Sequence, residues 1–561
     1  MKIRNYIYAI VAVMMISITS CKDQFELDLL DNPNAVTQVN ADIELYFNAI
    51  QLNMRNFLNS SNTGNGAFAV RLAFMGSVQY QAFYSGGDGG IWSTMYSNMF
   101  PDIDAMIALA EPKDGWVWIG AAKVMKAYAL MTMVDMHGDI PYSEAGQGVA
   151  VPSPIADDQV AVYNAAYAML TEAIGDLANP AAIGKPGQDM FYGGDPAQWT
   201  KLANTLKMRY AVTTRLVNGA GDFQALVSAG NFISAPGDSF KFPYGTEQFN
   251  PNSRHPFYNT HYGAPTSHGA YLNNDFMWRF RGEGGAGGDV EDPRRRYYFY
   301  RQTDGPGTAA VDLFTLDCVG ELRPDHYTDE MSFCIPSLNH QDATSSEGYW
   351  GRDHGNGDGT PPDGQLITNY GVYPGGGMVD KDQAISQKFN GTTGAQGRGI
   401  APYMMDSYVS FMRAEMALTQ GTSDDPRAMF EEGMRKSIGY VMAFATSRGQ
   451  DAGIFTPATN EIDAYVNSRL AAYDAATPDG KLDAVLYGAH KASFGAGMDV
   501  YNSYRRTGYP SGLQFMQEPD GGAFPRLFFY PNNYVNLNEN ATQRAITEQV
   551  FWDTNPAGFI N

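Results

Sequence analysis

Hydrophobic positions recur with helical spacing along most of this chain, and one long central stretch lacks that spacing. The clearest case is Trp116–Met136, where small alanines alternate with valine, leucine and methionine until Gly138 and Pro141, residue types that end helices. Residues 39–110 carry helical periodicity as well. The pattern predicts loops at 60–66 and 85–90 and helices at 68–83, 92–109, 158–177, 199–216, 404–420 and 427–446. We therefore expect a mostly α fold.

The central stretch, from about 236 to 400, is rich in glycine and proline. Runs such as EGGAGGD (283–289) and GRDHGNGDGTPPDG (351–364) are typical of loops. A loop-rich region of this length within a folded chain is usually functional. Because helices are predicted on both sides, we interpret it as an insertion into one helical body formed by about 39–235 and 401–561.

The first 20 residues have the pattern of a secretory signal. Lys2 and Arg4 precede an apolar stretch that is shorter than the roughly 20 residues needed to span a bilayer. Small polar residues and Cys21 follow, so the segment is similar to a bacterial lipoprotein signal in which Cys21 is lipidated. Residues 21–38 would then form a polar, turn-rich tether to a membrane surface. The alternative is an ordinary secretory signal with a chance cysteine.

The charge balance of the chain limits its possible partners. The 60 acidic residues outnumber the 38 basic ones, and no Lys/Arg-rich run occurs, which argues against nucleic acid as a partner.

Besides Cys21, the only cysteines in the sequence are Cys318 and Cys334. In an oxidising exterior they predict one disulfide that closes a loop of roughly 16 residues and contributes about 3 kcal/mol. Two buried thiols are the alternative.

Aromatic residues beside the glycine-rich loops are the candidate ligand contacts. Tryptophan and tyrosine faces stack on the flat apolar faces of sugars and peptides, and a neighbouring polar side chain can hydrogen-bond hydroxyls or amides. Packing of the loops against the body is the competing interpretation for each residue. The candidates are Tyr84, Trp92, Trp278, Tyr349 and Trp350.

The stretch after Trp350 also concentrates short oxygen donors with glycines. Asp353, Asn356 and Asp358 could form a calcium loop, although the spacing is not that of an EF-hand and no glutamate completes it. A turn formed by the Asn-Gly and Asp-Gly pairs is the alternative. No other cofactor is predicted.

No motif marks this chain as an enzyme. The sequence contains no G-x-S-x-G, no H-E-x-x-H and no P-loop. A surface glycan-degrading enzyme with two carboxylates is one alternative to a binding protein. A structural or adhesive surface protein built on the helices alone is another.

Several segments, in order along the chain, share the pattern of one family. The most specific is DMHGDIPYSEA (135–145), which predicts a helix-to-loop corner. The others are YGGD and WTKLANTLK (192–207), YWGRDHG (349–355), RRTGYP (505–510), FPRL and YP (524–531) and FWD (551–553). Together they resemble the SusD/RagB family of Bacteroidetes outer-membrane lipoproteins, and KDQFE (22–26) resembles the surface-export signal of such lipoproteins.

The resemblance implies a single SusD-like domain over 39–561, a body of tetratricopeptide-like helix pairs that carries a loop-rich ligand-binding insertion. It implies a lipid-anchored protein on the exterior face of the outer membrane. It also implies that the protein binds an oligosaccharide, or less favourably a peptide, and delivers it to a SusC-type TonB-dependent transporter without covalent chemistry.

Overall fold

The structure is a computed structural model of the 561-residue chain. It describes residues 42–77, 79–263, 271–280, 290–300, 351–355, 368–381, 391–516 and 520–560. The predictions for the signal, Cys21, Cys318, Cys334, Tyr349, Trp350, Asn356 and Asp358 fall outside these residues.

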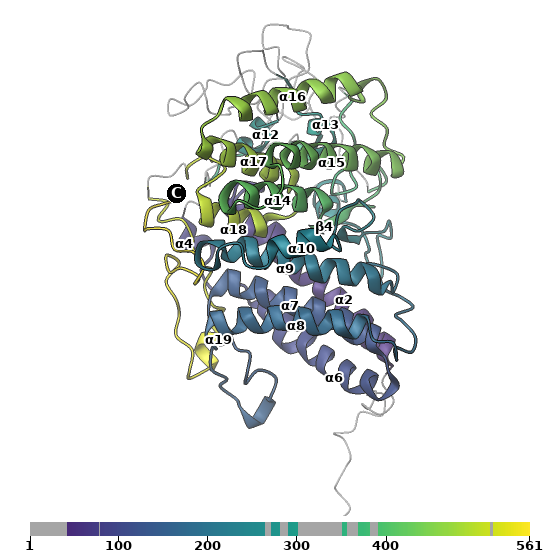
Figure 1. The fold of residues 1–561 in the computed structure, drawn as a ribbon, viewed down its shortest axis with the longest axis vertical. Helices are drawn as coiled ribbons and strands as arrows, with labels where there is room; N and C mark the ends of the chain where they lie inside the picture. Colours follow the sequence, from purple (N-terminus) through teal and green to yellow (C-terminus); the bar gives the residue numbers. More distant parts are fainter. Residues whose placement is uncertain are drawn as a thin grey trace, which may run out of the picture.

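The expected mostly helical class is confirmed. In the first part of the chain the long helices are α2 (Ile43–Asn59), α6 (Phe100–Ala110), α7 (Trp116–His137), α8 (Gln159–Leu177), α9 (Pro196–Asn218) and the short α10 (Phe223–Ala229). In the last part they are α14 (Asp406–Gln420), α15 (Pro426–Ser447), α16 (Thr459–Ala475), α17 (Pro478–Ala492) and α18 (Gly497–Thr507). Helix α7 packs along α8 and α14 along α15, and Figure 1 shows the helices stacked from α6 and α8 up to α16.

Helix α7 is buried within the stack and is apolar on all sides. By length and composition it could cross a membrane. However, 83% of its most apolar 18-residue stretch is buried inside the protein, as expected of a core helix. Gly120 brings α7 close to α8, since a Cβ there would lie 2.6 Å from Leu177 Cγ. The helix ends at His137, and Gly138 follows with a φ of +76°. The motif at 135–145 therefore forms the predicted helix-to-loop corner.

Three predictions near the N-terminus differ from the structure. The expected loop at 60–66 continues α2 as a wide turn of π-helix, because Ser61 and Asn62 bond back to carbonyls of Phe57 and Leu58. The expected helix at 68–83 is broken into α3 (Ala67–Ala69) and α4 (Tyr80–Phe83). The expected loop at 85–90 gives way to α5 (Gly89–Ser93) at its end, capped by the Asp88 side chain.

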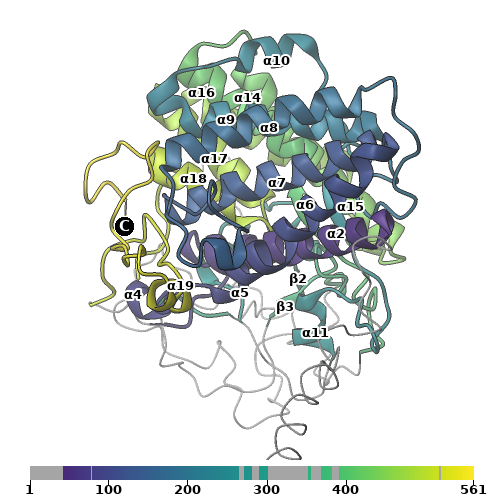
Figure 2. The ribbon, with the colours of Figure 1, turned by 90° about the horizontal axis from the view of Figure 1, so that it is seen from below.

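Two pairs of short strands lie in the described part of the central region. Strand β1 (Phe240–Pro243) pairs antiparallel with β4 (Ile400–Met404), so the two ends of the predicted insertion meet. Strands β2 (Phe299–Tyr300) and β3 (Asn369–Tyr370) form a second pair. Figure 2 shows β2, β3 and α11 (Pro256–Tyr262) on one side of the helical stack. The small helices α12 (Asn274–Trp278), α13 (Arg295–Tyr298) and α19 (Asn532–Leu537) lie in the central and C-terminal parts of the chain. The remaining elements are the π-helical turn η3 (Thr94–Met99), which interrupts the predicted helix 92–109, and the short 3-10 turns η4 (Glu111–Lys113), η5 (Gly148–Ala150) and η6 (Gly453–Phe455).

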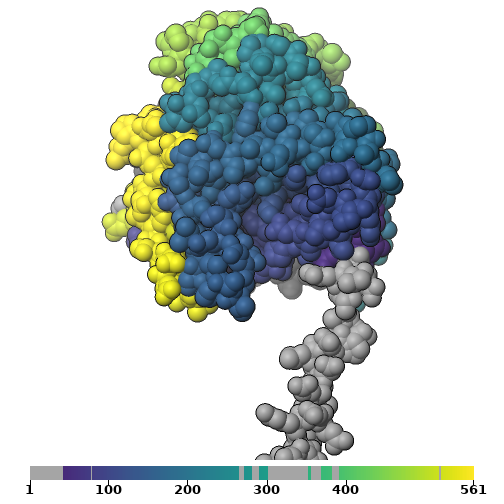
Figure 3. All heavy atoms as spheres, turned by 60° about the horizontal axis from the view of Figure 1, so that its bottom comes forward, coloured from purple at the N-terminus to yellow at the C-terminus, as the bar shows by residue number. Residues whose placement is uncertain are grey.

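The fully buried carboxylate of Asp135 joins the helices of the stack. Its Oδ2 accepts hydrogen bonds from Arg209 Nη2 and Asn502 Nδ2, both at 2.8 Å. Its Oδ1 accepts from the Tyr163 hydroxyl and from Trp552 Nε1, both at 3.1 Å. Four segments, α8, α9, α18 and the C-terminal tail, thus converge on α7. Figure 3 shows the tail lying against the N-terminal helices.

The arginine pair of the RRTGYP motif has a structural role, as its acidic surroundings suggest. Arg505 Nη2 donates to the Asp135 carbonyl at 2.7 Å, and its guanidinium carbon lies 4.7 Å from the Trp552 ring centroid. Arg506 donates to both oxygens of Glu415 at 2.9 Å, and Arg215 donates to Oε1 of the same residue. Burial alone would raise the pKa of Glu415, but the two arginines outweigh it and hold the pKa below its usual value.

We expect Asp135→Ala to lower the free energy of unfolding by about 3–5 kcal/mol, because it removes the partner of the buried Arg209 Nη2 and of three other buried donors. The control is Asp104→Ala. Asp104 pairs with Lys126, but its side chain is 62% exposed, so the loss should stay below about 1 kcal/mol. Denaturant-induced unfolding followed by circular dichroism measures both. Equal losses in the two variants would contradict the central role of Asp135.

Buried histidines predict a pH dependence of stability. Burial lowers the pKa of His137 to about 4, although the Phe528 carbonyl opposes this, and it lowers the pKa of His255 and His490 to about 3. In each case the folded pKa lies below the unfolded value near 6.5. These residues therefore contribute stability above about pH 6.5 that is lost as the pH falls toward the folded values.

We expect the midpoint of denaturant unfolding to fall between pH 7 and pH 4, with His137 alone contributing at most roughly 3 kcal/mol. In His137→Asn, the amide can keep the bond that the His137 ring Nδ1–H donates to the Phe528 carbonyl at 3.1 Å, while the titrating group is removed. Its midpoint should fall less steeply with pH than that of the wild type. Identical slopes would rule out His137 as a source of the dependence.

Candidate functional site

Helix α12 brings two of the predicted ligand-binding segments together. Asn273 caps it by accepting a bond from Phe276 N, and Trp278 is its last residue. The backbone before it pairs with the described part of the YWGRDHG motif. Arg352 N donates to Leu272 O, and Asn274 N donates to Arg352 O, both at 2.9 Å. Trp278 and the 351–355 segment, far apart in sequence, therefore lie in one region.

Asp353 and His354 attach this region to the helical body. Asp353 is buried, and its Oδ1 accepts bonds from Asn274 Nδ2 and Gln514 Nε2 at 3.1 Å. The His354 ring bonds the Tyr80 hydroxyl of α4 at 2.8 Å. Burial, and secondarily the charge of Arg71, lower the pKa of His354 well below its usual value. The three segments at 80–83, 274–278 and 351–355 are thus held as one unit.

A half-exposed aromatic cluster lies on one side of this unit. The Phe74 and Tyr271 rings meet edge to face with centroids 5.9 Å apart. The guanidinium carbon of Arg352 lies 4.4 Å from the Tyr271 centroid and 6.0 Å from that of Phe74. This cluster adjoins the predicted contacts Tyr349 and Trp350 in sequence.

A groove of about 530 Å³ lies beside α12, bounded by α15, α16, α17 and the segment after α18. Its volume is within the range of about 300–1,000 Å³ that is usual for small-molecule sites. Buried Phe430 and Met434 provide apolar surface, and half-exposed Trp278 and Tyr487 provide aromatic surface. The polar lining consists of Asp275, Arg279, Tyr465, Arg469, Asp483 and Ser511.

Arg279 fixes the shape of the groove. Its Nε donates to Asp275 Oδ2 at 3.0 Å, and its Nη2 donates to Gly512 O at 2.6 Å. Its guanidinium carbon also lies 5.0 Å from the Tyr487 ring centroid. Asp483 accepts bonds from the backbone N–H, at 2.9 Å, and the hydroxyl of Ser511. The 511–512 segment is therefore tied to α12 on one side and to α17 on the other.

The predicted contacts Tyr84 and Trp92 pack elsewhere. Tyr84 is 6% exposed, its hydroxyl donates to Asn65 O at 3.0 Å, and its ring packs on Phe528. Half-exposed Trp92 lies in an aromatic cluster with a centroid 4.6 Å from that of Tyr534. Neither residue lines the groove. The structure gives both of them packing roles, and ligand contact by either stays a prediction.

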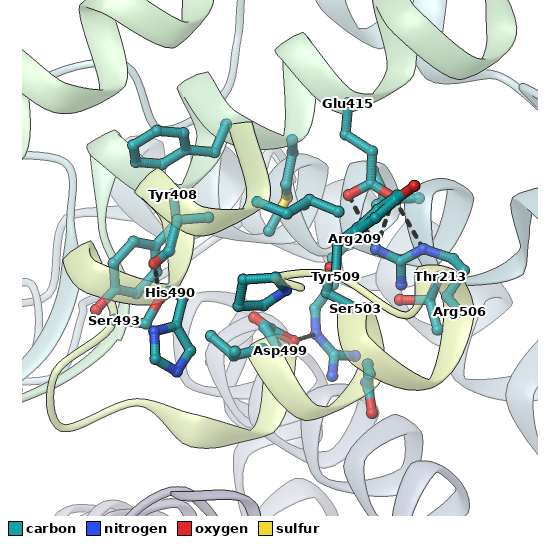
Figure 4. Close-up of a pocket in the computed structure, with 18 residues that line it drawn as sticks. Arg209, Thr213, Tyr408, Glu415, His490, Ser493, Asp499, Ser503, Arg506 and Tyr509 are labelled. Carbon is teal, nitrogen blue, oxygen red and sulfur yellow. Dashed lines mark hydrogen bonds and ion pairs between the residues drawn. The ribbon is translucent and has the colours of Figure 1, made fainter. Parts of the chain in front are cut away.

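A second cavity lies inside the helical body, between α9, α14, α17 and α18 (Figure 4). Its volume is about 60 Å³, well below that of a small-molecule site. Among the described residues, no group of three or more His, Cys, Asp or Glu side chains could hold a metal. Asp353 bonds two amides, and the calcium site with Asn356 and Asp358 stays a prediction. The groove is thus the candidate ligand site.

Family models cover most of the chain. One, described as "Starch-binding associating with outer membrane", matches residues 33–308, and another, described as "Susd and RagB outer membrane lipoprotein", matches residues 369–551. The chain belongs to the SusD/RagB family. None of the curated protein sequences matches it significantly.

Solved structures show the same SusD fold. A chitin-binding protein is 19% identical with a TM-score of 0.65, over 92% of this chain and 100% of the other. A SusD homologue of Bacteroides fragilis is 18% identical with a TM-score of 0.63, over 92% and 100%. A chitin-binding SusD homologue of Flavobacterium johnsoniae is 17% identical with a TM-score of 0.59, over 92% and 99%.

Proposed function

We propose that this SusD/RagB protein is a lipoprotein on the exterior face of the outer membrane that binds an oligosaccharide and delivers it to a SusC-type TonB-dependent transporter. Lipidation of Cys21 would supply the anchor. The observation that carries the proposal is the groove beside α12, which contains the predicted contact Trp278. The family membership supports it, and so does the likeness to proteins named as chitin-binding.

The groove lining suits a carbohydrate more than a peptide. The rings of Trp278 and Tyr487 and the apolar surface of Met434 can contact the C–H faces of sugar rings. Asp275 and Arg279 form an ion pair, so they present hydrogen-bonding groups to the groove without an isolated charge. Such a pair can exchange hydrogen bonds with sugar hydroxyls, whereas a charged peptide would need a strong partner charge in the site.

Binding without cleavage is favoured over a glycan-degrading enzyme. The two carboxylates of the groove lining, Asp275 and Asp483, are already bonded to Arg279 and Ser511. Through these bonds both carboxylates stabilise the groove walls. A hydrolase would instead need one of the two carboxyl groups to be free to donate a proton. The proposed role is therefore capture and release.

We expect Trp278→Ala to weaken binding of the cognate oligosaccharide about tenfold or more, because an aromatic contact at the centre of a site commonly contributes over 1 kcal/mol. Calorimetric titration of the mature, unlipidated domain against oligosaccharide and peptide panels, with product analysis, measures this. Trp118→Ala is the control, because Trp118 is another half-exposed tryptophan and lies outside the groove lining. Cleavage of any glycan would favour the enzyme instead.

A second pair of variants tests the groove without removing a wall residue. Ala472 lines the groove and Ala471 does not, although both are exposed on α16. Ala472→Trp should block binding and leave the thermal melt unchanged, whereas Ala471→Trp should bind like the wild type. Equal binding by both variants and by Trp278→Ala would place the ligand site outside this groove.

A further inference from the structure

A loop formed by residues 141–156 projects from the helical body, and its two ends are held together. The flanking residues Ile140 and Asp157 form an antiparallel bridge, in which Asp157 N donates to Ile140 O at 3.0 Å. The Asp157 carboxylate also accepts bonds from the backbone N–H groups of Tyr142 and Ser143, at 2.8 and 2.9 Å. The segment is therefore a compact loop with a fixed base, a type of loop that is frequently functional.

The loop is joined to the C-terminal part of the chain. Asn538, the residue directly after α19, donates from Nδ2 to Pro154 O at 2.8 Å. Figure 1 shows the loop and α19 side by side at one end of the molecule. Residues 139–158 and 530–543 thus form one surface, which is called the loop–α19 face below.

Three apolar side chains of the loop–α19 face are exposed to solvent. Val149, in the turn η5 of the loop, is 100% exposed, Leu537 is 81% exposed and Ile155 is 45% exposed. Ile155 and Leu537 are the sequence neighbours of the bonded pair Pro154 and Asn538, so they lie near each other. Apolar side chains in water do not stabilise this fold, whereas their burial against a partner is favourable.

The same face is acidic. Its two segments contain no lysine or arginine, and the first basic residue beyond them, Arg544, pairs with Asp139 and with Glu548. The other carboxylates form no ion pair within the described residues. They belong to Glu144, Asp157, Asp158 and Glu539. An acidic face repels an anionic lipid surface and attracts lysine and arginine, so it fits a protein whose apolar contact area is bordered by basic side chains.

We propose that the loop–α19 face is the surface through which this lipoprotein docks on its membrane transporter, with Val149, Ile155 and Leu537 entering an apolar socket bordered by basic residues. The inference rests on the proposed function, which makes a transporter the partner. The fixed base of the loop favours docking, because a preorganised loop loses little conformational freedom on binding. None of the residues of this face lines the ligand groove, so docking and ligand binding can be tested separately.

The test uses the tagged, lipidated protein, purified in mild detergent from the outer membranes of the bacterium that produces it. Mass spectrometry measures the ratio of TonB-dependent transporter to lipoprotein. We expect Val149→Asp and Leu537→Asp each to lower this ratio at least tenfold, because each would place a carboxylate in an apolar socket without a partner charge. Both positions are exposed, so the melting temperature of each variant should equal that of the wild type.

Ile454→Asp is the matched control. Ile454 is 93% exposed and, like Val149, is the middle residue of a three-residue 3-10 turn, but it lies between α15 and α16. This variant should keep the wild-type ratio. Wild-type ratios for Val149→Asp and Leu537→Asp, or an equal loss with Ile454→Asp, would overturn the docking face alone. A wild-type preparation without any transporter would refute the delivery step of the proposed function, and this inference with it.

Contact with a lipid surface is the other use that an exposed apolar tip can have. Sedimentation of the mature, unlipidated domain with phosphatidylcholine vesicles tests it. We expect the domain to stay in the supernatant, which would support a protein partner. Cosedimentation that Val149→Asp abolishes and Ile454→Asp does not would overturn the proposal and assign the loop–α19 face to the membrane.

Discussion

The ion pair between Asp135 and Arg209 is the constraint on which the rest of this fold depends. Both side chains are almost completely buried, so each loses its hydration, a cost that an isolated pair seldom recovers. Here the carboxylate accepts four hydrogen bonds, and the guanidinium also bonds Asp499. The donors come from α8, α9, α18 and the tail. The helices can satisfy Asp135 only in one mutual arrangement.

That arrangement explains how residues far apart in sequence form the ligand groove. Its lining includes residues of α12, α15, α16 and α17 and of the segment after α18. The Asp135 contacts fix α18 against α7, and the Glu415 contacts fix α18 against α14 and α9. Strands β1 and β4 join the ends of the central region at the same body. Arg279 then ties α12 to Gly512 and completes the wall.

The sequence pattern predicted the parts of the fold that local chemistry determines. Trp116–Met136 differs from the observed α7 by one residue, since its apolar content and the following Gly138 act locally. The π-helical turn at 60–66 was missed because the side-chain bonds of Ser61 and Asn62 outweigh the loop preference of the glycines. Helix α16 was also missed, because only Tyr465, Val466, Leu470 and Tyr473 of its residues are buried.

The candidate site was only partly predictable for the same physical reason. Trp278 stood out because it adjoins a glycine-rich run, and the structure places it in the groove. Tyr487, Arg469 and Asp483 have no local signal, since their role arises only when α16 and α17 pack beside α12. Tyr84 had the same sequence signal as Trp278 but is buried against Phe528. Proximity to a glycine-rich run therefore identifies candidates, and tertiary packing decides which of them line the groove.

Helix α18 shows how direct polar bonds fix one helix within the body. Asn502, Arg505 and Arg506 form direct charged or amide bonds that fix its register against α7 and α14. Direct ionic pairs tolerate little displacement because their energy depends on short distances. The bonds to Asp135 and Glu415 therefore fix the position of α18 within the body.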